Sequence, residues 1–197
     1  MSENFLKAHP FVAKWEGGLD DDPVDAGGIT KYGVSFAFLT DVAKESQANR
    51  ETLHRMSIKL PVTKDTIRNL TRDQSVSLFQ WQFWLRLNLD RFPLRVATVL
   101  YDAAVNCGRG TSVKLMQRGC IASGLLSGKG AERDDGILGK KTEAAFMAAD
   151  NEKTLELAIV ARENYYKAIV RSKPKQARFI NGWLNRTRDL RKYLRGL

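Results

Sequence analysis

The stretch that decides the fold is WEGGLDDDPVDAGGITKYG, residues 15–33. It follows a segment in which apolar side chains recur at helical spacing as far as Trp15. The two glycines after Glu16 suit the left-handed conformation in which many helices end. We therefore expect a helix over residues 4–16 and then an irregular, acidic, glycine-rich loop, with a short strand pair at residues 29–34.

Glu16 is the candidate general acid of this stretch. It stands at the negative end of the expected helix dipole and beside the indole of Trp15, and both conditions disfavour an ionised carboxylate. The sequence thus predicts a raised pKa for Glu16. A carboxyl group that keeps its proton near neutral pH is what a glycosidase needs to protonate a leaving oxygen.

Asp25 supplies a second carboxyl group nine residues later, in a polar loop where it should stay ionised. Glycoside hydrolysis uses two carboxyl groups with separated pKa values, one giving a proton and one activating water or stabilising the cation. Thr30 has a hydroxyl that can orient a water, and Tyr32 has a ring and a hydroxyl for a sugar. A buried aromatic is the ordinary alternative for Tyr32.

A calcium loop is the main structural alternative for this acidic stretch. Such loops place acidic or amide side chains at alternate positions and end on a bidentate Glu. Asp21, Val24 and Ala26 do not follow that pattern, and no Glu closes the loop. We expect no metal and no cofactor.

Several spaced motifs together resemble glycoside hydrolase family 108, a family of lysozyme-like N-acetylmuramidases from phages, prophages and bacterial genomes. In the first half these are Glu16-Gly17-Gly18, Asp22-Pro23 and Asp25-x-Gly27-Gly28-x-Thr30-x-Tyr32-Gly33. In the second half, three motifs are similar to the peptidoglycan-binding segment that usually follows this catalytic block: Tyr101-Asp102-Ala103-Ala104-Val105-Asn106-x-Gly108, Asp135-Gly136-x-x-Gly139-x-x-Thr142 and Gly182-Trp183-Leu184-x-Arg186.

The resemblance implies that Glu16 is the catalytic glutamate and that peptidoglycan is the partner. The Glu16, Asp25 and Thr30 spacing is similar to the Glu/Asp/Thr triad of phage-type lysozymes, although Thr30 falls one residue short. The expected catalytic residues are Glu16, Asp25 and Thr30. The expected substrate-binding residues are Tyr32, Asp22, Asn106 and Trp81.

The structural alternatives for the last two residues stay open. Trp81 and Trp84 lie at helical spacing, where an aromatic residue belongs to the core more often than to a sugar site. Asp102 and Asn106 are polar exceptions on the apolar helix that we expect after Pro93. They lie four residues apart, on one face, as capping groups or as supports for a site.

The expected fold is mainly α and lysozyme-like, a helical body with a short irregular or β loop forming one wall of a cleft. Residues 1–92 would form the catalytic lobe and residues 93–197 the helical peptidoglycan-binding lobe, packed as one compact body. Helix starts are predicted at Thr71, whose capping box includes Gln74, at Gly110-Thr111-Ser112 and at Asn151. The expected oligomeric state is a monomer.

Composition limits the class of protein. The 197 residues carry a net charge of +10 and no apolar run of about 20 residues, the length that spans a bilayer. A zinc site is not expected, because the chain offers neither a Cys-x-x-Cys pair nor enough histidine. Cys107 and Cys120 are expected as buried free thiols of a protein made in a reducing cytoplasm, and a disulfide between them is the alternative. Residues 171–197 hold nine Lys or Arg against Asp189, so 9 − 1 = +8 of the net charge lies there. An anionic polymer or surface is the expected partner of that segment, with the cations of the last helix facing outward.

Three functions compete on this evidence. The first is an endolysin-like N-acetylmuramidase that cleaves the β-1,4 bond between N-acetylmuramic acid and N-acetylglucosamine. The second is a weakly active or non-catalytic protein of wall binding or secretion. The third, a basic nucleic-acid binder, leaves residues 16–33 unexplained and lacks a nucleic-acid motif, so no nucleic acid is expected. The first residues do not read as a secretory signal. We expect synthesis in the cytoplasm and action in the periplasm or wall, after release by a separate holin.

Overall fold

The computed structural model describes residues 1–17, 19–20 and 28–197. The chain divides into two compact units: unit 1 contains Met1–Phe11 and Phe83–Leu197, and unit 2 contains Val12–Gln82. Helices dominate both units, which confirms the mainly α class. The expected lobes, 1–92 and 93–197, and their packing as one body stay predictions.

Unit 2 combines a small sheet with short helices. The strands β1 (Leu19–Asp20), β2 (Thr30–Lys31) and β3 (Val34–Ser35) form an antiparallel sheet in that order, in which Thr30 pairs with Asp20 and Ser35. The strand pair expected at residues 29–34 is present. The helices are α2 (Phe36–Glu45), α3 (Gln47–Arg55), α4 (Lys64–Arg68) and α5 (Arg72–Phe79), followed by the π-helix η1 (Gln80–Trp84), which reaches into unit 1.

Side-chain caps fix where these helices begin. The Thr71 hydroxyl accepts a hydrogen bond from the Gln74 backbone, and the Gln74 side chain accepts one from the Thr71 backbone, which confirms the predicted capping box. Thr63 forms a second capping box at α4, and the Ser35 and Ser46 hydroxyls each accept a backbone hydrogen bond at the start of α2 and α3. The core of unit 2 consists of buried aliphatic and aromatic side chains: Val12, Ile29, Val34, Leu39, Leu53, Ile67, Leu78 and Phe79.

Unit 1 is built on α6 (Leu94–Cys107), which follows Pro93 as predicted and buries every residue from Val96 to Ala104. The other elements are η2 (Leu85–Leu87), η3 (Leu89–Arg91), α7 (Arg109–Ser123), η4 (Gly130–Glu132), α8 (Lys140–Met147), α9 (Glu152–Ser172), η5 (Pro174–Phe179) and α10 (Ile180–Leu194). Asn151 caps α9 as predicted. The helix start expected at residues 110–112 was wrong, because α7 already begins at Arg109 and has no side-chain cap.

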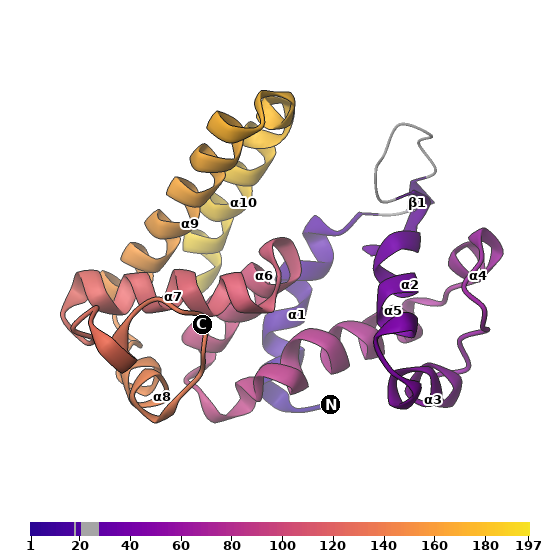
Figure 1. Ribbon diagram of the computed structural model, residues 1–197, viewed down its shortest axis with the longest axis horizontal. Coiled ribbons are helices and arrows are strands. Elements are labelled where there is room, and N and C mark those ends of the chain that lie inside the picture. Colours follow the sequence, from indigo (N-terminus) through magenta and orange to yellow (C-terminus); the bar gives the residue numbers. More distant parts are fainter. Residues whose placement is uncertain (18, 21–27) are drawn as a thin grey trace. The chain divides into compact units, whose positions relative to one another are not determined.

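Two close approaches hold unit 1 together. A Cβ on Gly119 of α7 would lie 2.7 Å from the Cβ of Ala158 on α9, so the backbones of these helices nearly touch. The N-terminal helix α1 (Glu3–Trp15) meets α10, because the Tyr193 hydroxyl donates to the Lys7 carbonyl over 2.6 Å and the Tyr193 ring packs on Phe11. Figure 1 shows α9 and α10 side by side as a long hairpin joined by η5.

Candidate active site

Glu16 directly follows α1 and is half-buried. Gly17 has a φ of +63°, the left-handed conformation that was expected to end this helix. Glu16 therefore stands at the carbonyl end of a 13-residue helix, and the raised pKa expected for it stays a prediction. This is the position that the sequence predicted for the general acid.

The turn between β2 and β3 lies directly against Glu16. Gly33 has a φ of +77°, and a Cβ built there would lie 2.5 Å from the Cβ of Glu16 and 2.9 Å from the Cζ of Phe79. No side chain larger than hydrogen fits between them. Gly33 thus lets the turn approach both Glu16 and the end of α5.

A buried hydroxyl holds this turn in place. The Ser75 side chain, on α5, donates to the Tyr32 carbonyl over 2.8 Å, and Ser75 is only 3% exposed. Tyr32 itself has a φ of +49° and is half-exposed. Its ring has the Lys31 ammonium 5.3 Å and the Arg72 guanidinium 5.1 Å from its centre. Both cations thus lie against the Tyr32 ring.

Thr30 lies at the start of β2, and its hydroxyl donates to the Gly28 carbonyl over 3.2 Å. The oxygen keeps lone pairs that can accept from a water. Trp81 is half-buried in η1, within unit 2. Asp22 and Asp25 lie outside the described residues, so the roles expected for them stay predictions, as do those of Thr30, Tyr32 and Trp81.

Asn106 belongs to unit 1 and is part of a buried polar network. Its side-chain oxygen accepts from the Tyr166 hydroxyl over 2.6 Å, and Tyr166 in turn accepts from Arg162. Arg162 also donates to Asp102, which is fully buried and accepts from Arg186 as well. Asp102 and Asn106 do share a helix face, as expected, but they bind side chains of α9 and α10.

The electrostatics of this network favour an ionised Asp102. Burial raises its pKa, yet the two guanidinium groups of Arg162 and Arg186 outweigh burial, and the pKa of Asp102 is lowered. Cys107 and Cys120 are free thiols, and burial raises the pKa of Cys120 to about 12. Among the described residues, no group of three or more His, Cys, Asp or Glu side chains is placed to hold a metal ion.

Sequence reasoning missed Ser75, Phe79 and Arg72 as neighbours of the Tyr32 turn. Their partners are about forty residues away along the chain, as the separation of 43 between Ser75 and Tyr32 illustrates. The only local signal was Gly33, which stood in the motif as a turn residue. Its role in making room for Glu16 depends on the fold.

Comparisons with known proteins identify a family and a similar fold. A model of the family "Glycosyl hydrolase 108" matches residues 9–108, and a model described as "Predicted Peptidoglycan domain" matches residues 111–188. The solved "Structure of Brucella abortus SagA" is similar with a TM-score of 0.72 and 24% identity, over 98% of this chain and 94% of that one. A search of curated proteins gives no match. No helix in the described part of the chain is both long and apolar enough to cross a membrane. Because the first family model covers just over half of the sequence and contains Glu16 and its neighbours, this protein belongs to glycosyl hydrolase family 108.

Proposed function

We propose that this peptidoglycan hydrolase is an N-acetylmuramidase, which cleaves the β-1,4 bond between N-acetylmuramic acid and N-acetylglucosamine. The family and the peptidoglycan domain support a glycosidase of the bacterial wall. The single observation that carries the catalytic assignment is the contact between Gly33 and Glu16, which sets the carboxyl group at a helix end against a turn without side-chain bulk.

Glu16 acts as the general acid in this proposal. It gives its proton to the glycosidic oxygen as the bond to the sugar breaks, and the leaving sugar departs as an alcohol. Asp25, assisted by the Thr30 hydroxyl, then stabilises the cationic sugar or takes a proton from the attacking water. The water adds to the sugar carbon, and the product is a new reducing end.

The test is Glu16→Gln, which keeps the shape of the side chain and removes the transferable proton. We expect loss of at least about a hundredfold in the release of reducing ends from purified peptidoglycan, the usual scale of general acid catalysis. Mass spectrometry of the wild-type products should show N-acetylmuramic acid at the reducing end.

Glu51→Gln is the matched control, since Glu51 is an exposed glutamate of the same unit, on α3. This variant should keep wild-type activity. A folded Glu16→Gln protein that still releases reducing ends would overturn the mechanism. A wild-type protein that binds walls without cutting them would favour the non-catalytic wall-binding alternative.

We also propose an endolysin role, in which the enzyme reaches the wall after a separate holin opens the membrane. The combination of a glycosidase family with a peptidoglycan domain supports this role. Expression alone in a Gram-negative host should leave cells intact, and a membrane-permeabilising agent should then lyse them. Lysis without the agent, or recovery of the protein from the periplasm of intact cells, would contradict this route.

A further inference from the structure

The tip of the α9–α10 hairpin carries a cluster of cations that no carboxylate of the described residues neutralises. The hairpin tip comprises the end of α9, η5 and the first turn of α10 (Figure 1). Residues 164–188 contain no Asp or Glu. The tip cations are exposed and form no ion pair with any described residue: Arg171, Lys173, Lys175 and Arg178.

Arg186 and Arg191 of α10 differ from these four. Arg191 pairs with Glu156 and Glu163, and Arg186 is buried on Asp102. The expected outward cations of the last helix are thus partly neutralised within unit 1. The four tip cations, in contrast, have no acidic residue between them in the chain.

An exposed aromatic side chain lies among the tip cations. Phe179 is 41% exposed, and the Arg178 guanidinium lies 4.6 Å from the centre of its ring. The ring of Phe179 stacks on Trp183 with centres 5.9 Å apart, and Trp183 stacks on Tyr166 at 5.0 Å. Arg178 and these rings form a continuous stack, which we call the aromatic column.

The combination of an exposed aromatic ring with cations indicates the kind of partner. Phe179 already has the Arg178 guanidinium and the Trp183 ring stacked on it. An exposed apolar ring surrounded by Lys and Arg matches the headgroup region of a bilayer, where phosphates pair with cations and an aromatic side chain enters the acyl boundary.

We propose that the hairpin tip docks this protein on membranes rich in anionic phospholipids. The four tip cations contact the headgroup phosphates, and Phe179 inserts its ring between the lipids. This docking is independent of the hydrolase activity, because it uses residues of unit 1 alone. It would hold the enzyme at a bilayer surface beside the wall.

The experiment measures flotation of the full-length protein with vesicles of phosphatidylcholine alone or mixed equally with phosphatidylglycerol. Wild type should bind only the anionic vesicles. Lys173→Gln with Lys175→Gln should weaken binding about twenty-five-fold, since each cation near an anionic surface contributes about fivefold. Phe179→Ser should weaken it severalfold, and high salt should abolish the charge-dependent part as the screening length falls from about 8 Å to about 3 Å.

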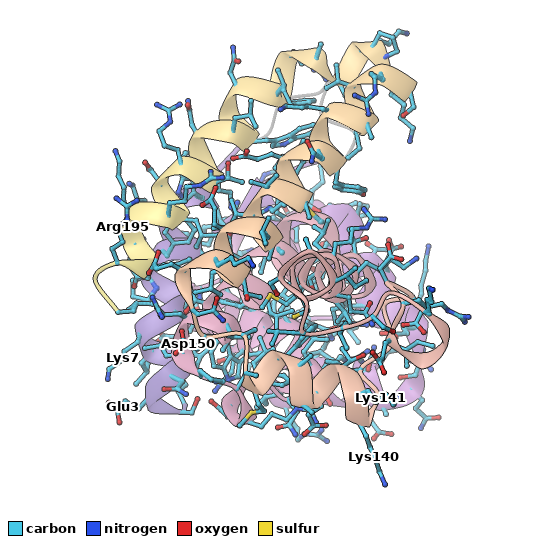
Figure 2. All side chains as sticks on the ribbon, turned by 90° about the vertical axis from the view of Figure 1, so that its left-hand side faces the viewer. Glu3, Lys7, Lys140, Lys141, Asp150 and Arg195 are labelled. Atoms are coloured by element: carbon cyan, nitrogen blue, oxygen red, sulfur yellow. The ribbon has the colours of Figure 1, made fainter. Side chains whose placement is uncertain are left out.

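The control is Lys140→Gln with Lys153→Gln, an equal loss of charge at exposed lysines of the same unit. Figure 2 shows Lys140 at the far end of unit 1 from the hairpin tip. This pair should bind like wild type. Equal losses in the control and tip variants would overturn the proposal, because nonspecific charge would then explain the binding.

A parallel arm uses purified peptidoglycan sacculi. Tip variants should bind sacculi and release reducing ends from soluble fragments like wild type, and Glu16→Gln should bind vesicles like wild type. Tip variants that lose sacculus binding while vesicle binding is unchanged would overturn the proposal in favour of the wall as the partner. Because vesicle binding and hydrolysis are measured separately, failure of this proposal is distinguishable from failure of the proposed enzyme function.

Discussion

Gly33 is the residue whose substitution acts most directly on Glu16. We predict that Gly33→Ala destabilises the protein by more than about 1 kcal/mol, because alanine is strained at a positive φ. Its methyl group would also displace the Glu16 side chain, from whose Cβ it would lie 2.5 Å. With Glu16 as the proposed general acid, hydrolysis of peptidoglycan should fall at least about a hundredfold, since small displacements of a catalytic group have effects of that size.

Gly124→Ala separates strain from displacement. Gly124 has a φ of +89°, and a Cβ there meets nothing within 4 Å. This variant should lose similar stability in urea unfolding and keep its activity. If the two variants lost activity equally, the contact between Gly33 and Glu16 would have no special role.

The residues of the site were predictable only where the chain itself brings them together. Glu16, Gly17 and the strand pair follow one another, so helix-ending glycines and the acidic loop were enough to place them. Ser75 and Phe79 were not predictable, because nothing in a serine or phenylalanine of a helix indicates which turn it will support. That information lies in the packing of α5 against the β2–β3 turn.

Helix starts, too, were predictable only where neighbouring residues carry the signal. Thr71 and Asn151 carry their own capping groups, and both were predicted. The start of α7 was placed too late, because Gly108 begins it with no side-chain cap. The role of Asp102 was also hidden, since its partners Arg162 and Arg186 lie 60 and 84 residues away.

The buried network in which Asp102 of α6 binds Arg162 of α9 and Arg186 of α10 gives a prediction about stability. Asp102→Asn leaves the buried Arg162 and Arg186 without a counter-charge, which should cost about 3–5 kcal/mol in the free energy of unfolding. Asp150→Asn removes a partly exposed partner of Arg95 and should cost about 0–1 kcal/mol. Urea unfolding of both variants checks this, and similar losses would mean that the buried network adds nothing special.

We also predict that the stability difference between wild type and Asp102→Asn depends on pH. The folded-state pKa of Asp102 is lowered from 3.8, so its contribution to stability is fully present above that value and is lost as the pH falls towards the folded pKa. The stability gap between wild type and Asp102→Asn should stay constant from neutral pH to about pH 4 and narrow below it. A gap that already narrows at about pH 6 would assign the effect to another group.

The division of the chain into two compact units does not coincide with the boundary between the two family models. The models separate after residue 108, whereas α6 belongs with α7 and α9 in unit 1. We predict that a chain ending at residue 110 keeps residues 12–82 protected from protease and loses protection of α6, whose apolar face would be bare. Adding the fragment 111–197 should restore the protection of α6. Protection of α6 in the truncated chain alone would contradict the prediction.

The hydrogen bond between the Tyr193 hydroxyl and the Lys7 carbonyl also implies an order in which parts of the chain fold during synthesis. Its partners are 186 residues apart, so the N-terminal helix waits roughly ten to forty seconds on the ribosome for its partner. Residues 12–82 are contiguous and have their own core, so they can assemble while translation continues. Protease protection of arrested nascent chains of increasing length would reveal this order. We therefore expect residues 12–82, with Glu16 and the turn against it, to fold first, and the N-terminal helix to reach its partner on α10 only after Tyr193 has been synthesised.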